Sequence, residues 1–147
     1  MFGTSGVRGP VGEDVTAGLA LDVGRALATD GAATVVVGRD ARDSGRMLVR
    51  ALLAGLTECG ADVIDIGVES TPTVARAVAR EGADAGVVVT ASHNPAPDNG
   101  IKLWTESGRA FGDERNDRIT EIVEAESFDL AAADAIGAVE ERDVVAG

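Results

Sequence analysis

Hydrophobic residues recur at two different spacings along the chain, and the spacing predicts which segments are helices and which are strands. Apolar positions three or four residues apart indicate amphipathic helices, whereas short runs of β-branched residues indicate buried strands. The predicted strands are residues 34–37, 63–66 and 87–89. The predicted helices are residues 16–29, followed by Gly31 as C-cap, 44–60 with Ser44 as N-cap, 71–82 with Thr71 as N-cap, and a last helix that Asp113 caps.

The segment after the third of these strands predicts a hairpin, whose arms are residues 101–104 and 109–111, joined by residues 106–108. Residues 128–147 are rich in alanine and acidic residues and have no hydrophobic period. We therefore expect one domain over residues 1–127, followed by a linker or the beginning of a second domain. Strands that alternate with helices predict βαβ crossovers. The expected fold is α/β, with three layers, α/β/α, around a mixed, mostly parallel sheet.

Length and composition limit the class of protein. A chain of 147 residues fits a single domain and buries enough surface to fold without disulfides. Cys59 is the single cysteine, which excludes an internal disulfide and a cysteine-built zinc site. No apolar run approaches the ~18 residues of a membrane span, and the first residues show no secretory signal. We expect a soluble, cytoplasmic protein without a membrane partner.

The net charge is strongly negative, and lysine is nearly absent. The chain has 25 Asp and Glu against 13 Lys and Arg, a formal net charge of −12, and Lys102 is its single lysine. Such a surface disfavours nucleic acid, whose phosphates need basic partners, so no nucleic-acid partner is expected. The acid-rich, lysine-poor composition is similar to that of proteins from salt-adapted (halophilic) archaea. The alternative is codon bias in a GC-rich genome, which explains scarce lysine but not the acid excess.

Salt is therefore expected to stabilise the protein. At ~0.1 M salt the Debye length is ~10 Å, so much of the repulsion among the excess carboxylates stays unscreened. Thermal midpoints measured from low to molar KCl should rise along the series. A flat or falling series would favour the codon-bias explanation.

Three of the predicted strands are followed by polar segments, which are residues 38–40, 67–70 and 90–95. Ligands of parallel sheets bind at the carboxyl ends of the strands. The last segment contains Ser92 and His93, the only histidine, and Lys102 follows ten residues after Ser92. A hydroxyl nucleophile, an imidazole and an ammonium group in one short stretch indicate a reactive site. The alternative on these residues alone is a loop histidine and a solvated lysine without a catalytic role.

Common phosphate-binding and hydrolase motifs are absent. The P-loop pattern G-x-x-x-x-G-K-[ST] fails because the one lysine follows Ile101. No predicted strand is followed by G-x-G-x-x-G, and no G-x-S-x-G turn surrounds a serine. The sequence therefore does not indicate a P-loop protein, a dinucleotide-binding fold or an ordinary serine hydrolase.

Four segments, in the same order, resemble motifs of the α-D-phosphohexomutase superfamily, which contains phosphoglucomutase, phosphomannomutase and phosphoglucosamine mutase. Residues 2–9, FGTSGVRG, are similar to its opening motif, and residues 38–44, GRDARDS, to the exit of its second strand. Residues 90–95, TASHNP, resemble its phosphoserine loop, and residues 99–102, NGIK, the segment just after that loop. On these motifs the chain is identified as the N-terminal domain, the first of the family's four.

The resemblance implies a reversible mutase that moves a phosphoryl group between C1 and C6 of a hexose phosphate. Ser92 would carry the phosphoryl group, and a sugar bisphosphate would be the intermediate. His93 and Lys102 would orient the attacking hydroxyl or exchange protons with it, and Arg8 would neutralise charge on the phosphoryl oxygens. Arg8, Ser92 and Lys102 would contact the substrate.

The resemblance also implies groups that this chain does not supply alone. The family binds Mg²⁺ through an Asp-x-Asp-x-Asp-Arg loop of its second domain, with the serine-bound phosphate, here on Ser92, as a further ligand. No such run is present, because Asp62 and Asp65 are wrongly spaced and belong to a strand. The expected cofactors are Mg²⁺, shared with the second domain, and a hexose 1,6-bisphosphate as activator.

Two classes of function stay open. The first is the catalytic N-terminal domain of a phosphohexomutase, which acts on a hexose phosphate together with the remaining domains of a longer enzyme and is inactive alone. The second is a stand-alone domain that binds a phosphosugar or a partner without turnover. In both, Thr90 and Asn94 are expected to shape the loop around Ser92. The apolar run that begins at Val144 favours the first class.

Overall fold

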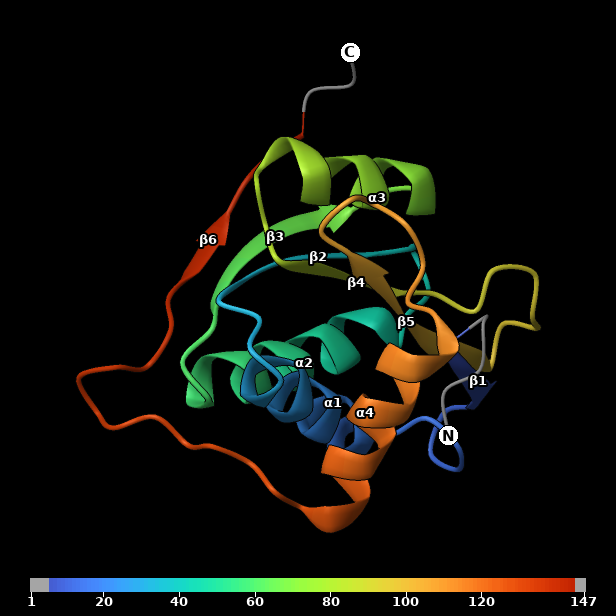
Figure 1. Cartoon of the computed structure of the whole chain (residues 1–147). Coiled ribbons are helices and arrows are strands. Elements are labelled where there is room, and N and C mark those ends of the chain that lie inside the picture. Colours follow the sequence, from blue (N-terminus) through green and yellow to red (C-terminus); the bar gives the residue numbers. More distant parts are fainter. Residues whose placement is uncertain (1–5, 145–147) are drawn as a thin grey trace.

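The computed structural model describes residues 6–144 and contains one sheet with helices on both faces (Figure 1). The strands are β1 Val7–Pro10, β2 Thr34–Arg39, β3 Asp62–Val68, β4 Ala85–Val89, β5 Asp98–Thr105 and β6 Val139–Glu141. The helices are α1 Ala17–Thr29, α2 Gly45–Glu58, α3 Thr71–Arg80 and α4 Asp113–Ala125.

The strand order, β1-β5-β4-β2-β3-β6, reverses at β2. Strands β2, β3, β4 and β6 pair in parallel, and β5 lies antiparallel between β4 and β1, so the expected mixed, mostly parallel sheet is confirmed. The chain passes from β2 through α2 to β3 on one side, and then through α3 to β4 on the other side. The carboxyl ends of β2 and β4 therefore lie side by side at the reversal, the position where open α/β sheets bind ligands.

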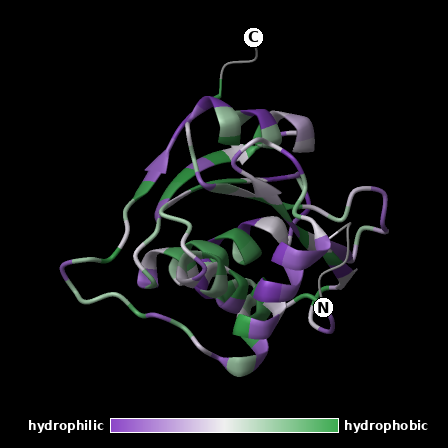
Figure 2. Ribbon diagram, viewed as in Figure 1, coloured by the Kyte–Doolittle hydropathy of each residue, from purple (hydrophilic) through white to green (hydrophobic). Residues whose placement is uncertain are grey.

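The helices form two outer layers around the sheet. Helices α1, α2 and α4 cover one face and α3 covers the other, because right-handed crossovers in opposite directions lie on opposite faces (Figure 1). Alternate residues of β2 accordingly enter different cores: Val35 and Val37 pack under α1 and α2, and Val36 packs under α3. Hydrophobic residues gather along the strands, whereas α4 is mainly hydrophilic (Figure 2). The three-layer architecture is confirmed.

Helices α1 and α2 pack closely because two buried glycines bring their backbones together. A Cβ atom on Gly55 would lie 2.1 Å from the carbonyl oxygen of Leu21, and one on Gly24 would lie 2.5 Å from that of Leu52. Both obstructing atoms belong to the backbone, which cannot rotate away as a side-chain end can. Glycine is therefore required at this crossing for packing reasons, although both residues have ordinary helical conformations.

Replacing Gly55 with alanine is expected to destabilise the protein by about 1–3 kcal/mol, because the added methyl group overpacks the crossing. Gly18→Ala is a matched control, since Gly18 is exposed in the first turn of α1 and the nearest atom to its new Cβ would be 3.8 Å away. Alanine at that position should raise the stability by about 0.5–1 kcal/mol. Urea unfolding measures both free energies of unfolding. Equal stabilities of the two variants would contradict the proposed packing constraint.

Two helices begin one residue away from the predicted caps. In α3 the N-cap is Ser70, whose hydroxyl accepts a hydrogen bond from the N–H of Thr73 at 3.3 Å, and Thr71 is already helical. In α4 the N-cap is Gly112, and Asp113 lies in the first turn, where a carboxylate interacts favourably with the helix dipole. The capping residues predicted for these two helices, Thr71 and Asp113, are therefore wrong by one position.

The predicted hairpin is present only in part. Strand β5 pairs with β4 along one edge, and with β1 along the first half of the other edge. The remaining half pairs with the returning chain through a single bridge between Trp104 and Ala110, and the N–H of Phe111 donates to the carbonyl of Leu103 at 3.0 Å. The second arm is therefore not a strand, and β5 begins three residues earlier than expected because β1 pairs with it there.

Strand β6 lies within residues 128–147, where the sequence indicated no regular element, and it extends the sheet by pairing in parallel with β3. All three of its residues are exposed, so burial leaves no pattern in the sequence. The close approach of this segment to β3 depends on Gly137. The N–H of Gly137 donates to the carbonyl of Thr57 at 3.0 Å. A Cβ atom on Gly137 would lie 1.7 Å from the carbonyl oxygen of Ala61, so a larger residue would not fit. The assignment of residues 128–147 to a linker or a second domain stays a prediction.

Candidate functional site

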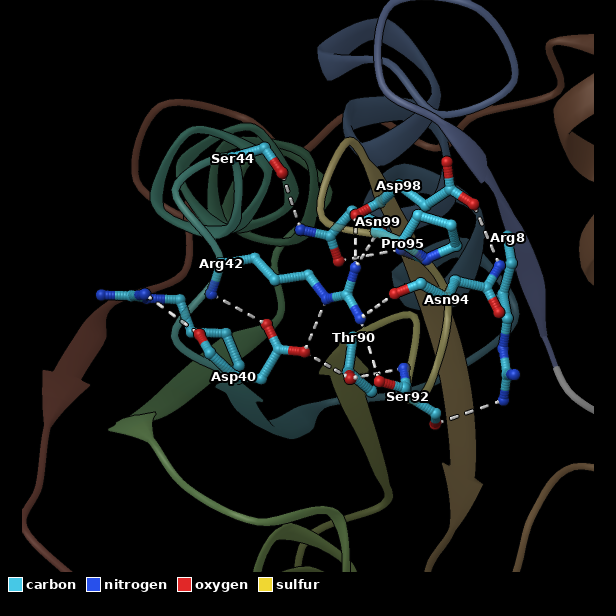
Figure 3. A network of polar contacts seen from close by, with 12 residues as sticks. Arg8, Asp40, Arg42, Ser44, Thr90, Ser92, Asn94, Pro95, Asp98 and Asn99 are labelled. Carbon is cyan, nitrogen blue, oxygen red and sulfur yellow. Dashed lines mark hydrogen bonds and ion pairs between the residues drawn. The ribbon is translucent and has the colours of Figure 1, made fainter.

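The candidate site lies where the exits of β2 and β4 meet (Figure 3). The N–H of Asp40 donates to the carbonyl of Val89 at 3.2 Å, which places the exit of β2 beside the end of β4. The hydroxyl of Thr90 donates to the Asp40 carboxylate at 2.6 Å and accepts a hydrogen bond from the N–H of Ser92 at 3.0 Å. Thr90, which is buried, therefore shapes the loop that follows β4, as the resemblance implied.

Ser92 has a left-handed backbone conformation, with φ of 52°. This conformation costs residues other than glycine roughly 1–2 kcal/mol, so the contacts around Ser92 must maintain it. Its N–H donates to Thr90, and its carbonyl oxygen accepts a hydrogen bond from the guanidinium of Arg42 at 2.9 Å. Both backbone polar groups of Ser92 are thus fixed, while the residue stays exposed at the surface.

Arg42 connects the exit of β2 to the whole loop. Its Nε donates to the Asp40 carboxylate at 3.2 Å, and the Asp40 carboxylate also accepts the N–H of Arg42 at 3.1 Å. The side chain is only 15% exposed, because the loop covers it. Its two terminal nitrogens donate to four backbone carbonyl oxygens, those of Ser92 (2.9 Å), Asn94 (2.8 Å), Pro95 (2.7 Å) and Asp98 (3.0 Å).

Amide side chains close the base of the loop. The Asn94 amide donates to the Asp98 carboxylate at 3.2 Å, within the loop. The side-chain amide of the buried Asn99 donates a hydrogen bond to the hydroxyl of Ser44 at 2.9 Å. Its oxygen accepts a hydrogen bond from the N–H of Gly100 at 2.8 Å. Ser44 is the N-cap of α2, as predicted, but its side chain makes no capping hydrogen bond, and its hydroxyl accepts a hydrogen bond from Asn99.

Arg8 approaches Ser92 from β1. Arg8 pairs with Gly100 of β5. A Cβ atom on Gly100 would lie 2.9 Å from the Cγ of Arg8, so the aliphatic part of the arginine side chain fits there because residue 100 is glycine. Its Nη2 donates to the hydroxyl oxygen of Ser92 at 3.4 Å, and its buried Nε has no hydrogen-bond partner among the described residues. A guanidinium has five N–H donors, so Arg8 can donate to further acceptors at this position. Residues 2–5 of the same motif lie outside the described residues.

The other two predicted site residues do not contact Ser92 through any hydrogen bond in the described part of the chain. His93 follows Ser92 and is exposed. Lys102 pairs with Val88 across β5 and β4, and its ammonium lies 4.9 Å from the centroid of the Trp104 ring. Because residues two apart on a strand share a face, Lys102 projects from the same face as Gly100 and therefore as Arg8. The catalytic roles given to these residues stay predictions.

The surroundings of the loop are open, and two arginines lie close to Ser92. In a chain of net charge −12, two arginines approach Ser92 within hydrogen-bond distance. A hollow of about 390 Å³ borders the loop and is lined by residues 41–44, 96 and 97. A second hollow, of about 350 Å³, contains Arg39, Arg46 and Arg50 but no residue of the loop. This chain thus presents Ser92 on a surface.

Metal and thiol chemistry were also considered. Within residues 6–144 no group of three or more His, Cys, Asp or Glu side chains is arranged to bind a metal. The carboxylates of Asp40 and Asp98 beside the loop already accept hydrogen bonds from Thr90, Arg42 and Asn94. Burial raises the pKa of the Cys59 thiol, which disfavours the thiolate, so this cysteine is not an activated nucleophile.

Two residues of this network, Asp40 and Arg42, received no role from the sequence. The motif over residues 38–44 contains both, and its position after a buried strand marked it as a candidate binding segment. What the motif did not indicate is that β2 and β4 are neighbours in the sheet, which brings Asp40 and Arg42 to the loop of Ser92.

Similarity to known proteins identifies the family. Residues 1–130 match the family model described as phosphoglucomutase/phosphomannomutase, alpha/beta/alpha domain I. The probable phosphoglucosamine mutase of Methanothermobacter thermautotrophicus is 47% identical over 146 residues, in a match that covers 98% of this chain and 32% of that protein. The phosphoglucosamine mutase of Rhodococcus opacus is 49% identical over 129 residues, with 83% and 29% covered. The chain therefore spans about a third of the length of these curated relatives.

Solved structures share the fold. The putative phosphomannomutase of Thermus thermophilus superposes with a TM-score of 0.82 at 31% identity, covering 97% of this chain and 33% of that one. A phosphoglucomutase/phosphomannomutase family protein of Burkholderia thailandensis gives a TM-score of 0.81 at 32% identity, with 97% and 34% covered. No helix among residues 6–144 is both long and apolar enough to cross a bilayer. The motif resemblance is confirmed, and the chain belongs to the phosphoglucomutase/phosphomannomutase family, in which it corresponds to the α/β/α domain I.

Proposed function

We propose that this chain is the phosphoserine-bearing domain of a phosphohexomutase, an enzyme that moves a phosphoryl group between C1 and C6 of a hexose phosphate. The observation that carries the proposal is the loop after β4. There the backbone of Ser92 is fixed on both sides, and its hydroxyl accepts a hydrogen bond from Arg8. A fixed hydroxyl beside a guanidinium is suited to carry a phosphoryl group, because guanidinium groups bind phosphoryl oxygens strongly.

The proposed reaction is a pair of transfers between oxygens. The phosphoryl group on the Oγ of Ser92 moves to the free hydroxyl of a bound sugar phosphate: the Oγ–P bond breaks, a sugar O–P bond forms, and the hydroxyl proton ends on Oγ. The bisphosphate turns over in the site, and its other phosphoryl group returns to Ser92 with the same balance reversed. Positioning and charge neutralisation supply most of the rate in such transfers.

Arg8, His93 and Lys102 have different proposed roles around Ser92. Arg8 neutralises charge on the phosphoryl oxygens, which its hydrogen bond to the Ser92 hydroxyl supports. His93 and Lys102 orient the sugar hydroxyl or exchange its proton. The exposure of His93 beside Ser92, and the position of Lys102 on the same face of the sheet as Arg8, support these roles.

The names of the relatives support a glucosamine phosphate as the hexose phosphate. Two proteins that are 47% and 49% identical to this chain, over 98% and 83% of its length, are named phosphoglucosamine mutases, one of them as probable. A hexose 1,6-bisphosphate would phosphorylate Ser92 and so activate the enzyme. Bound Mg²⁺ would supply positive charge to the phosphoryl group. This chain would contribute the oxygens of the phosphate on Ser92 to that metal site, and the other ligands would come from the rest of the enzyme.

A stand-alone domain that binds a phosphosugar or a partner without turnover is the second candidate. The exposure of Ser92 and the lack of a metal-binding cluster within residues 6–144 favour it. The length of the relatives, about three times that of this chain, favours the mutase.

Comparing the full-length protein with residues 1–147 alone separates the two candidates. With Mg²⁺ and a trace of glucosamine 1,6-bisphosphate, we expect the full-length protein to interconvert glucosamine 6-phosphate and glucosamine 1-phosphate. Residues 1–147 alone should show no turnover, because no group of side chains within residues 6–144 is arranged to bind the metal. Turnover by residues 1–147 would contradict the need for further domains. A full-length protein without turnover of any hexose phosphate would favour the binding domain.

A further inference from the structure

We propose that Arg42 is a positioning residue for phosphoryl transfer at Ser92, which it aligns through backbone carbonyl oxygens without touching the reacting hydroxyl. This inference rests on the proposed function and adds a residue to it. Arg42 lies outside the group of residues that contact the hydroxyl, because its hydrogen bonds reach the carbonyl oxygen of Ser92 and not its Oγ.

The contacts of Arg42 use every part of its guanidinium. Nη2 donates to two carbonyl oxygens at the beginning of the loop, those of Ser92 and Asn94, at 2.9 and 2.8 Å. Nη1 donates to two carbonyl oxygens at its end, those of Pro95 and Asp98, at 2.7 and 3.0 Å. One planar group therefore sets the distance between the two ends of the loop, as the converging dashed lines in Figure 3 show.

Asp40 fixes the guanidinium itself. Its carboxylate accepts from the Nε of Arg42 at 3.2 Å, and from the hydroxyl of Thr90 at 2.6 Å. Thr90 in turn accepts the N–H of Ser92. The two backbone polar groups of Ser92 are thus connected to the same carboxylate by separate routes, one through Arg42 and one through Thr90.

This arrangement explains how a serine keeps a left-handed conformation at φ 52°. Without the contacts, Ser92 would relax toward the conformations that L-residues prefer, and its Oγ would turn away from Arg8. A displacement of about 1 Å is enough to reduce a positioned reaction ~10²-fold. Lysine cannot replace Arg42, because an ammonium has three donors from one atom and no planar fork to reach four separate carbonyl oxygens.

The experiment measures kcat and KM of full-length Arg42→Lys and Arg42→Ala proteins, with activity normalised to the folded fraction from circular dichroism. Arg42→Lys should lower kcat ~10²-fold with KM within threefold, because the charge stays and the alignment is lost. Arg42→Ala should regain at least tenfold in kcat with millimolar guanidinium chloride, but not with equal ammonium chloride. Arg50→Lys is the matched control and should keep full activity, since Arg50 is exposed on α2 and its side chain makes no hydrogen bond or ion pair in residues 6–144.

The possible results separate this inference from alternatives. Arg42→Lys with kcat within threefold of wild type would overturn it, and so would equal rescue of Arg42→Ala by ammonium, because charge alone would then suffice. The proposal would also be overturned if the activity of the variants fell only in proportion to the folded fraction and guanidinium did not restore it. Arg42 would then contribute to stability alone. Ser92→Gly tests the proposed function separately: if it retains turnover, the serine carrier is wrong, whereas an inactive Ser92→Gly with an active Arg42→Lys contradicts only the role of Arg42.

Discussion

Ser92→Gly in the full-length protein is expected to lower mutase turnover by at least ~10⁴-fold, because the phosphoryl group loses the oxygen that carries it. Glycine is the informative replacement at this position. It adopts φ of 52° without the steric cost that alanine meets there, so the loop is expected to keep its conformation while the hydroxymethyl side chain is lost. The measurement is a coupled assay of hexose phosphate interconversion with saturating Mg²⁺ and bisphosphate.

The control for this variant is Ser107→Ala. Ser107 is exposed in the turn after β5, and within residues 6–144 the only hydrogen-bond partner of its hydroxyl is the hydroxyl of Thr105, at 3.0 Å. It should retain turnover within about twofold, since a surface substitution away from special contacts changes stability by ~0.5 kcal/mol or less. A Ser92→Gly enzyme with turnover near that of Ser107→Ala would mean that another residue carries the phosphoryl group.

The second large effect is expected for Lys102→Arg, which should lower kcat ~10²–10⁴-fold, the usual loss when one general acid–base group is removed. Arginine preserves the positive charge, and it also stacks on aromatic rings, so the contact with Trp104 survives. What arginine cannot do is release and regain a proton at neutral pH. The loss in kcat therefore reports proton transfer rather than charge, provided that thermal unfolding and the phosphate content of Ser92 are unchanged.

Arg109→Lys is the matched control for this substitution, because Arg109 is an exposed residue beyond β5 whose side chain makes no hydrogen bond or ion pair in residues 6–144. It should keep full activity. If Lys102→Arg is nearly as active as wild type, Lys102 provides only a fixed charge for phosphate. The proton then moves through His93 or through another part of the enzyme.

The parallel part of the fold was predictable because burial on both faces leaves an unbroken apolar run. In β4 every residue is buried, and the run at residues 87–89 indicated the strand directly. The ends of α3 and α4 were not predictable to the residue, because Ser70 and Thr71, or Gly112 and Asp113, are neighbouring residues that all suit a helix N-terminus.

Strand β6 was missed for a different physical reason. Its three residues are exposed, so hydrophobic periodicity carries no information about them. Its pairing depends on how closely Gly137 approaches Ala61, a contact between segments more than seventy residues apart. A similar limit applies to β5, whose first half forms because β1 pairs with it.

The part of the candidate site that depends on particular side-chain types was predictable from sequence motifs. Ser92, His93 and Arg8 belong to motifs that the sequence displays, and the structure joins two of them by a hydrogen bond. The contacts of Arg42 are different, because four of its acceptors are backbone carbonyl oxygens, which every residue possesses. The contacts of Arg42 follow from the pairing of β2 with β4 in the sheet, which the sequence does not indicate.

The measurement that tests the central claim most directly is the location of the transferred phosphate. The full-length protein, first freed of phosphate, is incubated with glucosamine 1,6-bisphosphate and Mg²⁺, digested, and analysed by mass spectrometry. The account predicts one added phosphate per chain on Ser92, absent from Ser92→Gly and reversed by excess glucosamine 6-phosphate. Phosphate on another residue, or none on Ser92 in an enzyme that turns over, would contradict it.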